Sequence, residues 1–76
     1  MTAEEMFKKL GYINIYRDEA YIKYEDKKSF TSVLITFYPI RQTFKIELLD
    51  ENGVYIYDIS IELLRAINKQ VEELGW

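Results

Sequence analysis

The sequence contains no cysteine and no histidine. Without cysteine there is no disulfide framework and no thiolate for metal binding or catalysis, so the core alone must stabilise the fold, and a reducing compartment such as the cytoplasm is expected. Without histidine the commonest general base and the commonest metal ligand are also missing. We therefore predict that the protein is not an enzyme and binds neither a metal nor a cofactor.

Glycine, proline and long apolar runs are scarce as well. Each of the three glycines is explained by local geometry, two as helix caps and one in a hairpin turn, so no glycine-rich loop remains to hold a phosphate. Adjacent acids such as Glu72 and Glu73 are typical of solvated surface, because acid–base work needs a cleft that shifts a pKa. The charged first ten residues predict neither a signal peptide nor a membrane span.

What the chain does contain is enough apolar material to fold. It is 49% hydrophobic and 16% aromatic, well above the composition of disordered segments. At 76 residues it can support one core, so we expect a single domain over residues 1–76. The net charge of −3 gives no reason to expect a phosphate-binding surface.

Two helices are predicted, one at each end of the chain. Thr2 followed by Glu5 matches a capping box and predicts a helix over residues 3–10, which ends at Gly11. Ser60 is a candidate N-cap for a helix over residues 61–74, which would close with Gly75 and Trp76 in a Schellman-type cap. Leu63 lies beside the predicted apolar face of this helix, which consists of Leu64, Ile67, Val71 and Leu74.

Between the helices the hydrophobic period is two, which predicts strands. The expected strands cover residues 12–16, 21–25, 30–38 and 43–49, with a short fifth at 54–58 after the Asn52-Gly53 turn. Strands followed by a helix favour an α+β fold, with a short N-terminal helix, a four- or five-stranded antiparallel sheet and the C-terminal helix packed on one face. The strand residues predicted to face this helix are Ile13, Ile15, Ile22, Tyr24, Val33, Ile35, Phe37, Phe44, Ile46 and Leu48.

The alternation places several large side chains on the opposite face of the sheet. From them we predict an interface for a second copy or for another protein, formed by Tyr12, Tyr16, Tyr21, Leu34 and Tyr38. In the alternative interpretation these residues only pack across strands or lie under the N-terminal helix. Both interpretations stay open at the level of the sequence.

Basic residues interleaved with aromatic ones suggest a second function. Lys8, Lys9, Lys27 and Lys28, together with the tyrosines and Phe30, could form a stacking platform for single-stranded nucleic acid. Acids such as Glu19 and Asp26 lie close to the basic residues in sequence, so the charge is mixed. Nucleic-acid binding is therefore the alternative and a protein contact the leading hypothesis.

Both ends of the chain carry a resemblance to a known family. The opening run from Met1 to Tyr12 (MTAEEMFKKLGY) and the closing run from Leu64 to Trp76 (LRAINKQVEELGW) resemble small proteins encoded by phages and prophages of Gram-positive bacteria. The two runs cover about a third of the chain and consist of helix caps and core positions. The family has no assigned activity, so the resemblance implies only the cytoplasm of a host cell and an accessory or interaction role.

Overall fold

The computed structural model describes residues 1–50 and 58–76 of the chain. They form helices and one sheet in the order α1 (Ala3–Lys9), β1 (Ile13–Arg17), β2 (Ile22–Lys27), β3 (Thr31–Tyr38), β4 (Thr43–Asp50) and α2 (Ile61–Glu73). The predicted Asn52-Gly53 turn and most of the fifth strand lie outside the described residues. The described part of the chain has the α+β fold that the sequence predicts.

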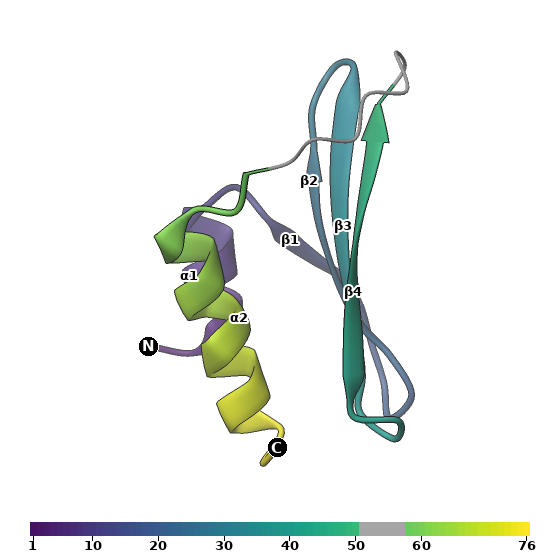
Figure 1. Cartoon of the computed structure of the whole chain (residues 1–76), viewed down its shortest axis with the longest axis vertical. Coiled ribbons are helices and arrows are strands. Elements are labelled where there is room, and N and C mark those ends of the chain that lie inside the picture. The colour runs from purple at the N-terminus through teal and green to yellow at the C-terminus, as the bar shows by residue number, and fades with distance from the viewer. Residues whose placement is uncertain (51–57) are drawn as a thin grey trace.

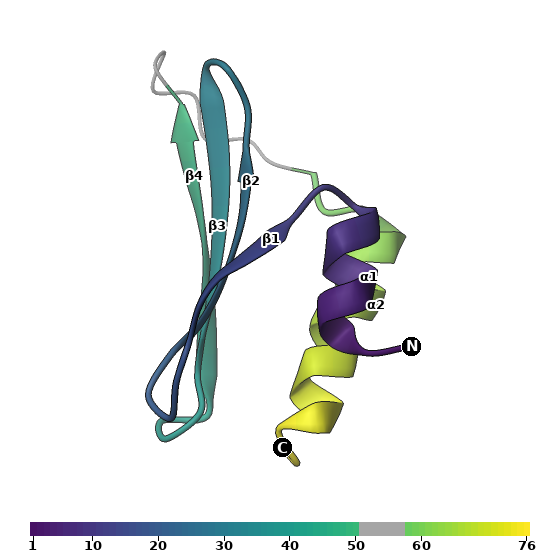
Figure 2. The ribbon, with the colours of Figure 1, turned by 180° about the vertical axis from the view of Figure 1, so that it is seen from behind.

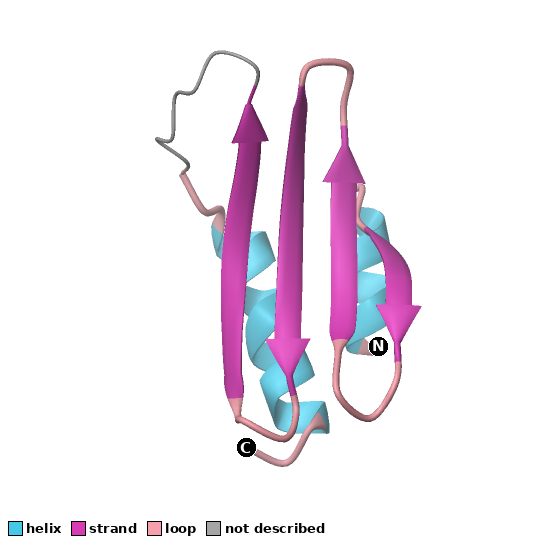
Figure 3. Ribbon diagram, turned by 90° about the vertical axis from the view of Figure 1, so that its right-hand side faces the viewer, coloured by secondary structure: helices cyan, strands magenta, loops and turns pink. Residues whose placement is uncertain are grey.

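The sheet is an antiparallel meander with the strand order β1-β2-β3-β4 (Figure 3). Its register sets Tyr24 opposite Ile35 and Ile35 opposite Ile46. The next row along the strands consists of Lys23, Thr36 and Lys45. Because paired residues share a face and successive residues alternate, neighbouring rows point to opposite sides of the sheet.

Both helices lie on the same side of this sheet, α1 beside α2 (Figures 1 and 2). The predicted capping box of α1 is confirmed, since the Thr2 hydroxyl accepts a hydrogen bond from Glu5 N and the Glu5 carboxylate accepts one from Thr2 N. Ser60 caps α2 by accepting a hydrogen bond from Leu63 N at 3.0 Å. The other side of the sheet carries no element of the described chain.

Each helix ends in a Schellman motif built on a left-handed glycine. Gly11 has φ +95° and Gly75 has φ +77°, conformations that favour a residue without a Cβ. The N–H of the following residue reaches back to the last turn, Tyr12 N to Phe7 O at 2.9 Å and Trp76 N to Val71 O at 3.2 Å. The predicted C-terminal cap is therefore confirmed.

The core lies between the sheet and the helices and draws on α1, β2, β3 and α2 alike. Its centre is aromatic, with the Phe7 ring stacked on Tyr24 at 4.0 Å and the Phe37 ring edge-on to both. A helix as short as α1 is marginal alone, so its docking through Phe7 accounts for its stability. The buried apolar residues are Ala3, Phe7, Tyr12, Ile22, Tyr24, Val33, Ile35, Phe37, Leu63, Ala66 and Ile67.

The predicted sidedness of the first strand was wrong. Tyr12 is only 4% exposed, whereas Ile13 is 67% and Ile15 48% exposed. Because Tyr12 follows Gly11 in the helix cap, its ring packs against Phe7 on the helix side, which turns Ile13 outward. The register then shifts between Asn14 and Tyr16, so a β-bulge at Ile15 restores Tyr16 to the side away from the helices.

Two further core predictions were wrong. Leu64 is 45% exposed, because the buried face of α2 consists of Leu63, Ala66, Gln70 and the predicted Ile67. Through this face α2 packs against α1 and accepts a hydrogen bond from Tyr24 of the sheet. Phe44 is 43% exposed, since it lies on the edge strand β4 and stacks on Phe37 only from one side. Ile46 and Leu48 are partly buried against the core.

Candidate interaction surface

The side of the sheet away from the helices is the candidate functional surface, and we refer to it as the open face. The register, together with the ring contacts of Tyr21, assigns its residues. It is wide because it spans all four described strands and has no helix over it (Figure 3). Its central members are Tyr16, Tyr21, Lys23, Glu25, Leu34, Thr36, Tyr38, Lys45 and Glu47, and the register adds Ile13, Lys27, Ser32, Thr43 and Leu49 toward its edges.

Three tyrosines meet on this face, Tyr16 from β1, Tyr21 directly before β2 and Tyr38 at the end of β3. The Tyr21 ring lies edge-on to Tyr16 at 6.2 Å and to Tyr38 at 5.6 Å between centroids. Tyr16 and Tyr21 are exposed, at 48% and 41%, and Tyr38 is half-buried. Of the predicted interface, Tyr16, Tyr21, Leu34 and Tyr38 thus share one surface, but Tyr12 does not belong to it, because it is buried in the core.

Cationic side chains cover the faces of these rings. Lys23 Nζ lies 5.6 Å from the centroid of Tyr21, while Arg41 and Lys45 lie 5.2 and 5.8 Å from that of Tyr38. Such contacts stabilise a cation by the negative potential of the ring face. These cations could not be grouped with the tyrosines from the sequence, since only the strand register brings them together.

The tyrosine cluster is anchored to the β1–β2 turn through Asp18. The Tyr16 hydroxyl donates to Asp18 Oδ2 at 2.6 Å, and Asp18 Oδ1 accepts hydrogen bonds from the backbone N–H groups of Ala20 and Tyr21. The hydrogen bond from Tyr16, followed by those from the backbone, lowers the pKa of Asp18. The same bond and the Asp18 charge raise the pKa of Tyr16, so its hydroxyl stays a donor to higher pH.

Charges on the open face are arranged in rows of one sign. Lys23 and Lys45 flank Thr36 in one row, and Glu25 and Glu47 flank Leu34 in the next. Lys45 Nζ forms an ion pair with Glu47 at 3.4 Å. Hydrogen bonds to the Tyr38 hydroxyl and to Glu47 raise the pKa of Lys45 above its ordinary value.

Thr36 occupies the centre of the lysine row and is buried there, although it is polar. It is 1% exposed, although it lies on the side without helices, because it lies between the lysine side chains of the neighbouring strands. Within the described residues its hydroxyl has no hydrogen-bond partner. The centre of the open face therefore carries a buried polar group that the monomer does not use.

A small hollow adjoins the tyrosine cluster. It measures ≈ 180 Å³ and is lined by Ala20, Tyr21, Tyr38, Ile40 and Arg41, which come from the turns at that end of the sheet and the adjacent strand ends. Ile40 is 78% exposed beside it. The hollow and the exposed isoleucine extend the apolar part of the open face toward the β3–β4 turn.

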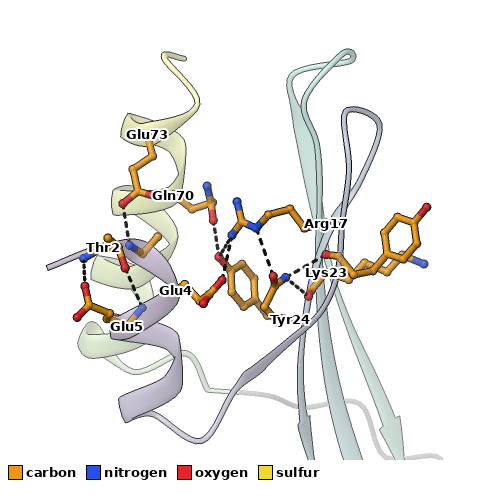
Figure 4. Close-up of polar contacts among 11 residues, drawn as sticks. Thr2, Glu4, Glu5, Arg17, Lys23, Tyr24, Gln70 and Glu73 are labelled. Atoms are coloured by element: carbon orange, nitrogen blue, oxygen red, sulfur yellow. Dashed lines mark hydrogen bonds and ion pairs between the residues drawn. The ribbon is translucent and has the colours of Figure 1, made fainter.

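The most connected polar cluster lies on the opposite side, between the sheet and the helices (Figure 4). The Tyr24 hydroxyl donates to Gln70 Oε1 at 2.6 Å and accepts a hydrogen bond from Arg17 Nη2 at 2.9 Å. Arg17 also forms a long ion pair with Glu4 at 3.7 Å. Burial raises the pKa of Tyr24, and the nearby Arg17 charge partly opposes this. These contacts join α1 and α2 to the sheet, which is a structural role.

The basic residues proposed for a nucleic-acid site are not brought to the tyrosines. Lys8 and Lys9 lie on α1, which packs on the opposite side of the sheet (Figure 2). Lys27 lies at the far end of β2, opposite Ser32, and Lys28 in the following turn forms an ion pair with Asp26 at 3.8 Å. The predicted basic and aromatic platform is therefore not formed by these lysines.

The chain matches no protein-family model, and no curated protein or solved structure is significantly similar to it. Within residues 1–50 and 58–76, no helix is long and apolar enough to cross a membrane. The same residues contain no group of three or more acidic side chains placed to hold a metal ion. The fold and the open face thus define the protein as a small α+β domain with one sheet face left uncovered by its described elements.

Proposed function

We propose that this protein is a non-enzymatic interaction module that binds another protein chain through the open face. The observation that carries the proposal is the contiguous cluster of Tyr16, Tyr21 and Tyr38 on a sheet face that no described helix covers. The accessory role and the phage or prophage origin that the sequence resemblance implies are part of the same proposal.

Tyrosine suits such a contact for physical reasons. Each ring offers a large contact area with few rotatable bonds, and its hydroxyl tolerates water when the partner is absent. The Tyr16 ring is further held in place by the hydrogen bond to Asp18, so little conformational entropy is lost on binding. The hollow beside Tyr21 and Tyr38 supports the proposal, because a partner side chain can fill it.

A differential capture experiment tests the proposal. The variant Tyr16→Ser with Tyr21→Ser changes two exposed rings and should leave the core intact, which circular dichroism and thermal melting can verify. We expect this variant to lose the partners that the wild-type chain retains from a host lysate. Loss of an identified partner is then quantified with the purified pair.

A matched control uses the surface of α2. Ile61→Ser with Leu64→Ser also removes two exposed apolar side chains, which are 59% and 45% exposed, but on a helix on the other side of the molecule. We expect this control to capture partners as the wild type does. If the tyrosine variant retains every partner, or if only the α2 control loses them, the open face is not the functional surface.

Single-stranded nucleic acid is the second candidate, because Lys23, Arg41 and Lys45 lie against the tyrosine rings. Binding of this kind requires ring faces on which bases stack. Here the cations themselves lie over the ring faces of Tyr21 and Tyr38, and Glu25 and Glu47 form the neighbouring row. These observations favour a protein partner.

Binding to labelled single-stranded oligonucleotides at several salt concentrations separates the two candidates. For nucleic-acid binding, the logarithm of the affinity would fall linearly with the logarithm of salt concentration. We expect no saturable binding at physiological salt. A salt-dependent isotherm that Lys23→Ala with Lys45→Ala abolishes would favour nucleic acid over protein.

A further inference from the structure

We propose that the occupant of the open face is a second copy of this chain, stacked face to face so that the lysine row of each copy meets the glutamate row of the other. This inference rests on the proposed function, since it names the partner of the same surface. It follows from the arrangement of charge on the face rather than from its exposure.

The two charged rows lie next to each other and span the same strands. Lys23 and Glu25 come from β2, Lys45 and Glu47 from β4, and the rows are centred on Thr36 and Leu34 of β3. A face-to-face dimer needs a two-fold axis within the interface, which makes the contact self-complementary. The direction of that axis decides which rows oppose each other.

Consider an axis that runs across the strands, between the two rows. It reverses the strand direction but keeps each strand over its own copy, so Lys23 lies over Glu25 of the second copy and Lys45 over its Glu47. Each contact occurs twice because of the symmetry. The arrangement therefore brings every charge of the two rows opposite the other sign, with Thr36 over Leu34 between them.

An axis that runs along the strands gives the opposite result. It keeps the rows in place and exchanges β2 with β4, so Lys23 would lie over Lys45 of the second copy and Glu25 over its Glu47. Like charges opposed across an interface are disfavoured. The rows thus select the antiparallel stack. This choice holds despite sheet twist, because packed sheets are rotated by about 30° about the direction perpendicular to them, and residues near the centre of the face move little in that rotation.

Size predicts that the contact is weak and reversible. The open face measures roughly 20 by 25 Å, from strands about 4.8 Å apart and about 3.3 Å per residue. Covering it removes less area than the roughly 800 Å² per partner of a standard stable interface. The dimer therefore forms in a concentration-dependent way, with a dissociation constant in the micromolar range or weaker.

The charges are available for this contact although Lys45 already pairs with Glu47. The two side chains are 51% and 40% exposed, so each has a free side. Exposed ion pairs contribute little to stability, and their rearrangement costs correspondingly little. Nothing in the described part of the chain covers the rows from above (Figure 3).

Charge reversal tests the pairing directly. One variant carries Lys23→Glu with Lys45→Glu, and the other carries Glu25→Lys with Glu47→Lys. In each variant alone the two rows carry charges of one sign, so its self-association should weaken at least about tenfold. Mixed in equal amounts, the two variants are complementary and should form a heterodimer. Sedimentation equilibrium from about 10 µM to 1 mM covers the relevant range.

Two controls address folding and net charge. The chain with all four reversals keeps its composition and should dimerise like the wild type, which shows that the reversals are tolerated. Lys9→Glu with Arg65→Glu changes the net charge as much as the double lysine variant does, but on the helices, and should leave self-association unchanged.

Each outcome decides the inference. Dimerisation of the wild type, its loss in both double variants and its return in their mixture support the antiparallel stack. A wild type that stays monomeric throughout, double variants that dimerise as before, or a mixture that stays monomeric each overturn it. A monomeric wild type leaves the proposed function standing if Tyr16→Ser with Tyr21→Ser still abolishes capture of a different protein, so the two failures are distinguishable.

Discussion

We expect that Tyr24→Phe destabilises the fold, although it removes only a hydroxyl group. That hydroxyl donates to Gln70 Oε1 at 2.6 Å and accepts from Arg17 Nη2 at 2.9 Å. Gln70 is 1% exposed, so its oxygen would be left buried without this donor. An unsatisfied buried group costs about 1–3 kcal/mol. The free energy of unfolding should therefore fall by about 2 kcal/mol, while the ring can keep its stacking on Phe7.

A double-mutant cycle isolates the cause. Gln70→Met removes the buried acceptor and replaces it with an apolar side chain of similar length, so Tyr24→Phe should cost much less in that background. The measurement is urea unfolding followed by circular dichroism, with the midpoint and slope fitted separately. Tyr24→Phe within about 0.5 kcal/mol of wild type, or costs that simply add in the double variant, would refute the reasoning.

The same hydroxyl predicts the alkaline behaviour of the fold. Burial raises the pKa of Tyr24 above its ordinary value, so the folded chain holds this proton more tightly than the unfolded chain. The contribution is fully present below the unfolded pKa of about 10 and is lost as the pH rises through the folded pKa. Stability should decline in that window for the wild type and less steeply for Tyr24→Phe.

Four other changes have expected outcomes. Thr36→Val should stabilise the fold by up to about 1 kcal/mol in urea unfolding, since the buried Thr36 hydroxyl lacks a hydrogen-bond partner in the described chain. A fall in the free energy of unfolding of more than about 1 kcal/mol would instead show that this hydroxyl has a hydrogen-bond partner. Trp76→Ala should cost about 1–2 kcal/mol in the same assay, less than a fully buried aromatic, because the ring is half-buried; an unchanged midpoint would show that it contributes nothing. Gly75→Ala should cost about 1–2 kcal/mol through its left-handed φ alone, since no atom lies within 4 Å of the added Cβ. In an NMR titration the Asp18 carboxylate should protonate at a pH below the ordinary pKa of an aspartate, and Tyr16→Phe should raise the midpoint of this Asp18 titration. Any stability that the Asp18 carboxylate contributes should be lost as the pH falls through its lowered pKa.

The fold class and most element positions could be predicted from the sequence because local signals agreed with each other. The Thr2 capping box, the Ser60 cap and the glycines at 11 and 75 act within a few residues, and all four occur as predicted. The alternation along β2 and β3 likewise places Tyr24 and its neighbours on the helix side. Such features depend on short-range chemistry that a sequence pattern records directly.

The wrong predictions concern residues at which two local sequence signals conflict, or at which tertiary packing determines the side-chain orientation. At Tyr12 the strand alternation competed with the helix cap, and the cap determined which way the ring points. The bulge at Ile15 then removed the apparent two-residue period of Ile13 and Ile15, which a sequence pattern does not distinguish from a regular strand. Gln70 was missed because a buried glutamine is only recognisable once Tyr24 is seen beside it.

The candidate surface could be predicted only in part, for a related reason. That large side chains gather on one side follows from the alternation, and Tyr16, Tyr21 and Tyr38 do meet there. The grouping of Lys23 and Lys45 into one row follows instead from the register of β2, β3 and β4. Register depends on turn geometry and core packing between segments, so the sequence alone does not order charges across strands.

The composition of the open face is best understood from what the sheet needs when it stands alone. Strand residues must be good β-formers, and an uncovered face of isoleucine and valine would invite unspecific aggregation. Tyrosine keeps the strand preference, and cations over the rings, as Lys23 over Tyr21 and Arg41 over Tyr38, reduce the apolar area in contact with water. A partner must then match both the rings and the charges above them. This combination of exposed rings and charges is what the interaction module that we propose would require.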